Sequence, residues 1–109
     1  MNSITTHVLD TVLGKPAAGI RVRLEQLVDR TWRTVAESAT DGDGRCRDLS
    51  QAPEKGTYRL IFATGDYLGP QGRSTLYPEI VIDFLCSGDA HYHLPLLLSD
   101  NSYTTYRGS

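Results

Sequence analysis

The sequence predicts an all-β protein, a sandwich of two sheets with about eight short strands and at most one short helix. Segments rich in Val, Ile, Thr and Tyr recur at a spacing of roughly 8 to 12 residues, and Gly, Pro and Asp separate them. No long segment has the periodicity of an amphipathic helix. The 109 residues suffice for one small domain with a real core. We therefore expect a single domain over residues 1–109, without linkers or repeats.

The first expected strand covers residues 4–10. Its side chains alternate between two faces, and Thr5, His7 and Leu9 share one of them. His7 does not follow the apolar pattern of a core strand. The strand is followed by a turn at 14–17, Gly-Lys-Pro-Ala, in which glycine permits a positive φ and proline fixes the next one.

A hairpin is expected next. Residues 20–25 alternate apolar and charged side chains, the pattern of a strand with one buried face and one face in water. Asp-Arg at 29–30 makes a short connection, and residues 31–38 form the returning strand.

The glycine-rich segment 40–45, Thr-Asp-Gly-Asp-Gly-Arg, begins like a calcium-binding loop. An EF-hand loop needs an oxygen ligand at its fifth position and a bidentate glutamate at its twelfth. Arg45 and Ala52 occupy those positions, so the calcium interpretation fails. A tight turn that delivers Arg45 onto the next strand is the better account.

The second half contains strands over 57–64 and 79–86, and the terminal segment 91–109 predicts two paired strands joined by a polar turn. Between the first two, residues 65–72 are a loop by composition, with a short helical turn near 71–75 as the alternative.

Composition excludes several classes of function. The formal net charge of −2 with interspersed signs gives no basic patch for nucleic acid and no polybasic run for a membrane surface. No basic segment followed by an apolar one opens the chain, and about eighteen consecutive apolar residues occur nowhere. We expect a cytosolic protein in which Cys46 and Cys86, which have no metal-ligand spacing, are reduced thiols.

Several strands of the expected sandwich carry polar, titratable side chains on faces that should be exposed to solvent. By strand parity His91 and His93 share a face, and Tyr106 of the last strand is a neighbour of His93 if the two faces coincide. His7 could complete a metal site with the two histidines, but the nearest further candidate is an arginine, so no metal is expected. The alternative is an ordinary closing hairpin whose His and Tyr side chains face water.

Six segments together carry a resemblance to a known family: residues 5–11, 14–17, 40–45, 77–79, 91–99 and 106–109. They resemble the 5-hydroxyisourate hydrolases, the transthyretin-related enzymes of urate breakdown. The similarity covers essentially the whole chain, and the terminal Tyr-Arg-Gly-Ser is the signature that separates these enzymes from transthyretin.

The resemblance implies a transthyretin-like sandwich of two four-stranded sheets, paired edge to edge into dimers and assembled into a homotetramer whose active sites line a central channel. It implies hydrolysis of a ring C–N bond of the small-molecule substrate 5-hydroxyisourate, giving 2-oxo-4-hydroxy-4-carboxy-5-ureidoimidazoline. Such a cyclic amide hydrolase needs neither a cofactor nor a metal.

The resemblance also implies the roles of individual residues. His7, Arg45, His93 and Ser109 correspond to the catalytic positions, and His7, Arg45 and Tyr106 to substrate-binding positions. The Ser109 hydroxyl or the terminal carboxylate would orient a histidine. Which histidine is the general base stays open.

Two segments depart from the family pattern. Residues 99–102 read Ser-Asp-Asn-Ser where a proline and an aromatic residue are more usual, and residues 67–75 are rich in glycine and proline where the family tends to place a short helix. Two other functions stay open: a carrier that binds a small aromatic ligand in the channel, and a plain structural sandwich.

Overall fold

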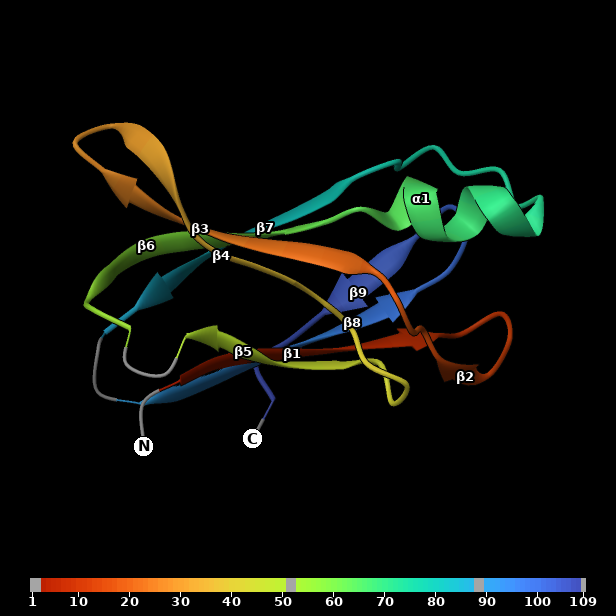
Figure 1. Ribbon diagram of the computed structural model, residues 1–109, viewed down its shortest axis with the longest axis horizontal. Coiled ribbons are helices and arrows are strands. Elements are labelled where there is room, and N and C mark those ends of the chain that lie inside the picture. Colours follow the sequence, from red (N-terminus) through yellow and green to blue (C-terminus); the bar gives the residue numbers. More distant parts are fainter. Residues whose placement is uncertain (1–2, 51–52, 88–89, 109) are drawn as a thin grey trace.

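The computed structural model of the protein describes residues 3–50, 53–87 and 90–108, which form two β-sheets packed against each other (Figure 1). Within this part of the chain there are nine strands, one short α-helix and one 3-10 turn. They are β1 Ser3–Asp10, β2 Lys15–Pro16, β3 Arg21–Val28, β4 Thr31–Ala39, β5 Arg45–Ser50, β6 Gly56–Phe62, α1 Thr64–Leu68, η1 Gly69–Gln71, β7 Ile80–Cys86, β8 His91–Leu98 and β9 Tyr103–Thr105. The predicted all-β sandwich is confirmed.

One sheet has the strand order β4-β3-β6-β7, and all its neighbours are antiparallel. The other has the order β2-β1-β8-β9, with β5 also paired to β1. Because β8 follows one edge of β1 along its whole length, β5 and the two-residue β2 share the other edge. This sheet therefore contains five strands in four positions, where the resemblance implied four strands.

The pairing of β1 with β8 is parallel and runs from Ser3 opposite His91 to Asp10 opposite Leu98. It places the beginning of the chain beside its last quarter. Figure 1 shows β1 and β8 side by side in the same layer.

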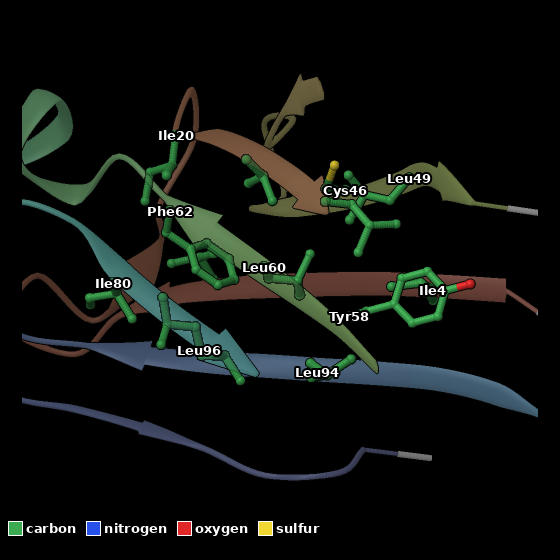
Figure 2. Packing of buried hydrophobic residues seen from close by; sticks show 14 of the residues in the cluster. Ile4, Ile20, Cys46, Leu49, Tyr58, Leu60, Phe62, Ile80, Leu94 and Leu96 are labelled. Carbon is green, nitrogen blue, oxygen red and sulfur yellow. The ribbon is translucent and has the colours of Figure 1, made fainter. Parts of the chain in front are cut away.

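The core lies between the sheets and comes from alternate residues of each strand. Ile4 and Val8 of β1 point inward and are fully buried, while Thr5 and His7 lie half-buried on the outer face. Side chains of β6 and β8 fill the space between the layers in Figure 2, among them Leu60, Phe62, Leu94 and Leu96. Each buried side chain of this size contributes about 1.5–3 kcal/mol. The alternation that builds the core also fixes which residues face outward.

The helical segment lies earlier than the position near 71–75 considered from the sequence. The chain forms α1 directly after β6, then η1, and Gly72 with a φ of 70° ends the turn. Burial of Leu68 and the hydrogen bond from Thr64 Oγ1 to the Tyr77 carbonyl hold the helix in place. Tertiary packing thus outweighs the low helix propensity of the glycines in this segment.

Two smaller expectations are confirmed. Asp29 and Arg30 form the tight β3–β4 connection, and both have a positive φ, as a two-residue hairpin of type I′ requires. Cys46 and Cys86 are free and buried. Across the residues described, no helix has both the length and the apolar character needed to cross a membrane.

Candidate active site

Three strands bring the sequence-predicted residues to one outer face. His7 of β1 lies opposite Arg45 of β5 in their antiparallel pair. On the other edge of β1, Thr5 lies opposite His93 of β8. An imidazole from the first strand, a guanidinium from the fifth and an imidazole from the eighth therefore lie close together, although the chain separates His7 and His93 by most of its length.

His93 is held by its side chain and by its backbone. Its ring Nδ1 is 2.8 Å from the Thr5 hydroxyl oxygen, and its carbonyl accepts a hydrogen bond of 2.8 Å from the Gly108 N–H. The second bond ties the end of the described chain to the site. Nε2 makes no hydrogen bond to any residue in the described ranges, so this nitrogen is free to interact with a ligand.

The pKa of His93 lies below its ordinary value of 6.5. Partial burial is the largest cause, because it disfavours the charged imidazolium. The positive charge of Arg45 and the nearby His91 and His7 act in the same direction. At neutral pH the ring is therefore uncharged and able to accept a proton.

The orientation of His7 follows from its hydrogen bond. Its Nε2 lies 2.8 Å from the carbonyl oxygen of Asp43, and a carbonyl can only accept. Nε2 therefore carries the hydrogen, and in the neutral ring Nδ1 holds the free lone pair. In His7 the nitrogen available for proton transfer is thus Nδ1.

The turn before β5 creates this acceptor. The Asp41 carboxylate accepts hydrogen bonds from the backbone N–H groups of Asp43 at 2.9 Å and Arg45 at 3.0 Å. Gly44 has a φ of 76°, and a Cβ there would lie 2.4 Å from the Val8 carbonyl oxygen. The turn predicted to deliver Arg45 onto a strand does so, and it also positions His7.

A hollow of about 260 Å³ opens on this face. It is lined by Thr5, Thr6, Arg45, Arg47, His91 and His93. His7 is absent from the lining and reaches the site as the neighbour of Arg45. Tyr106 and His93 line a second, more apolar hollow of about 250 Å³, so His93 lies at the border of both. Ser109 lies outside the described residues.

Two titratable lining residues were not among the predicted site residues. His91 was considered only as a metal ligand, and Arg47 was not singled out. The rings of His91 and His93 are nearly parallel, with centroids 6.2 Å apart, and the Ser3 hydroxyl pairs with Nδ1 of His91. His91 could have been predicted from the sequence, because it lies two residues before His93 and therefore on the same face of the strand. Among the residues described, no group of three His, Cys, Asp or Glu side chains could hold a metal ion.

A two-sheet sandwich whose first strand pairs in parallel with the penultimate strand, and whose outer face holds this polar cluster, defines a transthyretin-like protein. The chain belongs to the HIUase/Transthyretin family, whose family model matches residues 4–108.

Three relatives illustrate the similarity. The 5-hydroxyisourate hydrolase of Salmonella typhimurium is 44% identical over 111 residues, which cover 99% of this chain and 82% of that protein. The structure of Klebsiella pneumoniae 5-hydroxyisourate hydrolase is 36% identical with a TM-score of 0.89 and full coverage of both chains. Sea bream transthyretin in complex with thyroxine is 31% identical with a TM-score of 0.93, covering 97% of this chain and 94% of that chain.

Proposed function

We propose that this protein is a 5-hydroxyisourate hydrolase that opens the substrate ring by adding water across a C–N bond. The observation that carries the proposal is the convergence of His7, Arg45 and His93 from three strands on one outer face. Its support from relatives is the 44% identity, over nearly the whole chain, with an enzyme of that name.

Water is a poor nucleophile at neutral pH, so the reaction needs a base. His7 and His93 position a water molecule and take its proton as the oxygen attacks the ring carbonyl carbon. The lowered pKa of His93 keeps its imidazole neutral, and His7 presents Nδ1 because its Nε2–H is bound to Asp43. General-base catalysis of this kind contributes about 10² to 10⁴ in rate.

Attack places negative charge on the carbonyl oxygen, and Arg45 stabilises it. The guanidinium stays charged and presents several N–H donors in a plane. When the C–N bond breaks, the ring nitrogen receives the proton from the histidine. The ring-opened product carries a carboxyl group, which holds the oxygen and one hydrogen of the water, and a ureido group, whose nitrogen holds the other hydrogen. The carboxyl group then releases its proton to the solvent.

The remaining predicted residues keep their proposed roles. Tyr106 shapes the substrate site from the second hollow, where it lies with His93. Ser109 follows Gly108, whose N–H binds the His93 carbonyl, and its hydroxyl or the terminal carboxylate orients a histidine.

We also propose that the protein is a homotetramer whose active sites line a channel between subunits. A hollow of about 260 Å³ on a single chain is smaller than the roughly 300–1,000 Å³ of ligand pockets, so walls from partner subunits would complete it. The two free, buried thiols are compatible with the proposed cytosolic location.

The alternative function is that of a carrier for a small aromatic ligand. The apolar hollow beside Tyr106 and the likeness to a transthyretin crystallised with thyroxine favour it. Two histidines and an arginine on the same face favour catalysis instead, because carriage needs no neutral base beside a fixed positive charge.

The test follows the ultraviolet absorbance of freshly generated 5-hydroxyisourate with and without the protein. In His7→Gln the amide can replace the Nε2 donor to Asp43 but offers nothing at Nδ1. In His93→Asn the amide can replace Nδ1 beside Thr5 but not Nε2. We expect wild type to accelerate the decay and both variants to lose about 10² or more of that rate.

The reverse pair, His7→Asn and His93→Gln, also lacks the imidazole and should be inactive as well. Size-exclusion mass is measured for every variant, so that loss of catalysis is not confused with loss of assembly. No acceleration by the wild type over buffer would exclude the hydrolase, and thyroxine binding would then be measured as the carrier assay. Full activity in His7→Gln or His93→Asn would exclude that histidine as a base.

A further inference from the structure

The β1–β5 pairing contains an irregularity beside the candidate site. Ile4 lies opposite Ser50 and Thr6 opposite Cys46, so β5 uses four residue steps where β1 uses two. Residues 47–49 therefore occupy the space opposite Thr5 alone, and the two extra residues form a bulge. Bulges redirect side chains and are enriched next to active sites. Here the bulge includes Arg47, which lines the same hollow as Arg45.

The hollow has a charge opposite to that of the protein. Its lining contains two guanidinium and two imidazole groups and, among the described residues, no carboxylate, whereas the whole chain has a formal net charge of −2. Arg45 and Arg47 take part in no ion pair with any residue in the described ranges.

The carboxylates nearest in sequence are engaged elsewhere. Asp48, adjacent to Arg47, accepts hydrogen bonds from the Ser38 hydroxyl and the Cys46 thiol. Asp41 accepts two N–H groups of its own turn; these bonds chiefly lower its pKa, and the charges of Arg47 and Arg45 add to the effect. Asp41 therefore feels Arg47 electrostatically but lies outside ion-pair distance, and the donors of Arg47 stay available to a ligand.

We infer that Arg47 is a further substrate-binding residue, which with Arg45 gives this hollow its selectivity for planar anions bearing carbonyl or carboxylate oxygens. The inference rests on the proposed function for the identity of the substrate, but the anion preference is separate from catalysis. Arg45, opposite His7, acts at the reacting carbonyl. Arg47, two residues further along β5, binds another edge of the ring and contributes to affinity rather than to the chemical step.

The experiment uses the full chain with Arg47→Ala, Arg47→Lys and Arg33→Ala. Arg33 is an exposed arginine on β4 without an ion pair among the described residues, and it serves as the control for loss of one positive charge. Steady-state hydrolysis gives kcat and KM. Calorimetry measures the binding of urate, a planar purine anion that lacks the scissile chemistry, and of hypoxanthine, a neutral purine.

For Arg47→Ala we expect KM and the urate dissociation constant to rise about 10- to 100-fold, the range for losing hydrogen bonds to a charged group. The kcat should stay within about threefold, and Arg33→Ala should match the wild type. Arg47→Lys should recover part of the urate affinity, since the charge remains without the planar donors. Hypoxanthine affinity should not change.

Unchanged KM and urate affinity in Arg47→Ala, or no urate binding to the wild type, would overturn the inference while leaving the hydrolase intact. The opposite result is also informative: urate binding depends on Arg47 while the wild type does not accelerate 5-hydroxyisourate decay. It would establish the anion site and exclude the proposed reaction.

Discussion

Two arginine clusters near opposite ends of β1 differ in how their charges are satisfied. At the end of the strand, Arg73 forms ion pairs with Asp10 at 2.6 Å and with Asp100 at 2.7 Å. Near its beginning, Arg45 and Arg47 line a hollow and have no ion-pair partner within the described chain. The charge of Arg73 is thus neutralised within the protein, whereas the charges of Arg45 and Arg47 are available to a ligand.

The Asp10 cluster is satisfied in every direction. The Asp10 side chain is 0% exposed, and it accepts hydrogen bonds from Arg73, from the Tyr67 hydroxyl and from the backbone N–H groups of Val12 and Leu13. Burial alone would raise its pKa, but these hydrogen bonds outweigh burial and lower the pKa to about 2. The bonds to both carboxylates raise the pKa of Arg73.

The largest expected effect is on the structural side of this comparison. Asp10→Ala should lower the free energy of unfolding by about 3–5 kcal/mol, because it leaves the largely buried Arg73 without its main partner. Urea denaturation at pH 7 measures the change. The control is Asp83→Ala on β7, an exposed aspartate without an ion pair in the described ranges, which should change stability by less than about 0.5 kcal/mol. If Asp10→Ala and Asp83→Ala lowered the free energy of unfolding equally, the structural role of the Asp10–Arg73 ion pair would be contradicted.

Arg45→Ala should reduce activity and leave stability unchanged, the opposite of the expectation for the Asp10–Arg73 pair. Loss of oxyanion stabilisation should reduce kcat for 5-hydroxyisourate by about 10² to 10³, while stability stays near that of the wild type because no ion pair is broken. Turnover and urea midpoints measured on the same preparation separate the two quantities. Arg45→Lys tests the geometry: full turnover in this variant would mean that charge suffices and the planar donors are unnecessary.

Acid should remove the contribution of Asp10 selectively. Its pKa is lower in the folded protein than its ordinary value of 3.8, so its stabilisation is complete above that value and is lost as the pH falls towards about 2. The shift corresponds to about 2 kcal/mol. The stability gap between wild type and Asp10→Asn should narrow over this interval in urea titrations. A gap that is constant down to pH 2 would exclude the titration of Asp10 as its cause.

The smallest expected effect concerns the acid limb of activity. Because His93 must be neutral to act as a base, kcat/KM should rise with pH, and the midpoint of this rise should lie below 6.5, since burial and then the Arg45, His91 and His7 charges lower its pKa. His91→Asn can retain a partner for the Ser3 hydroxyl but removes one of these charges. Its acid limb should move upward towards 6.5. A downward shift would contradict the assignment of His93 as the titrating group.

The alternation of apolar and polar residues predicted the sandwich and the outer face of His7, since strand parity needs no tertiary information. It did not locate the helix. Gly65 and Gly69 suggested a loop, yet a Cβ on Gly65 would lie 3.1 Å from Pro78 backbone atoms, so this glycine permits the helix to pack closely. That role depends on a contact across 13 residues of chain and is invisible in a local pattern.

The candidate site was likewise predictable only in part from the sequence. His7 and His93 stood out because polar residues broke an expected pattern, Arg45 because a glycine-rich turn precedes it, and the resemblance assigned their roles. The position of Arg47 depends on a bulge in β5, and register irregularities leave no sign in an alternating sequence. The Asp10–Arg73 pair was missed for a related reason: two common charged residues 63 positions apart carry no signal that they meet.

The parallel pairing of β1 with β8 also has a consequence for biosynthesis. An edge of β1 lacks its partner until residues 91–98 have left the ribosome, so the nascent chain exposes an unpaired strand edge while the intervening residues 11–90 are synthesised. Contacts this distant in sequence also slow folding, because closing such a loop costs entropy before any pairing is gained. Enzymatic activity cannot appear before this pairing has formed, and exposed β1 edges would be the place where nascent chains aggregate.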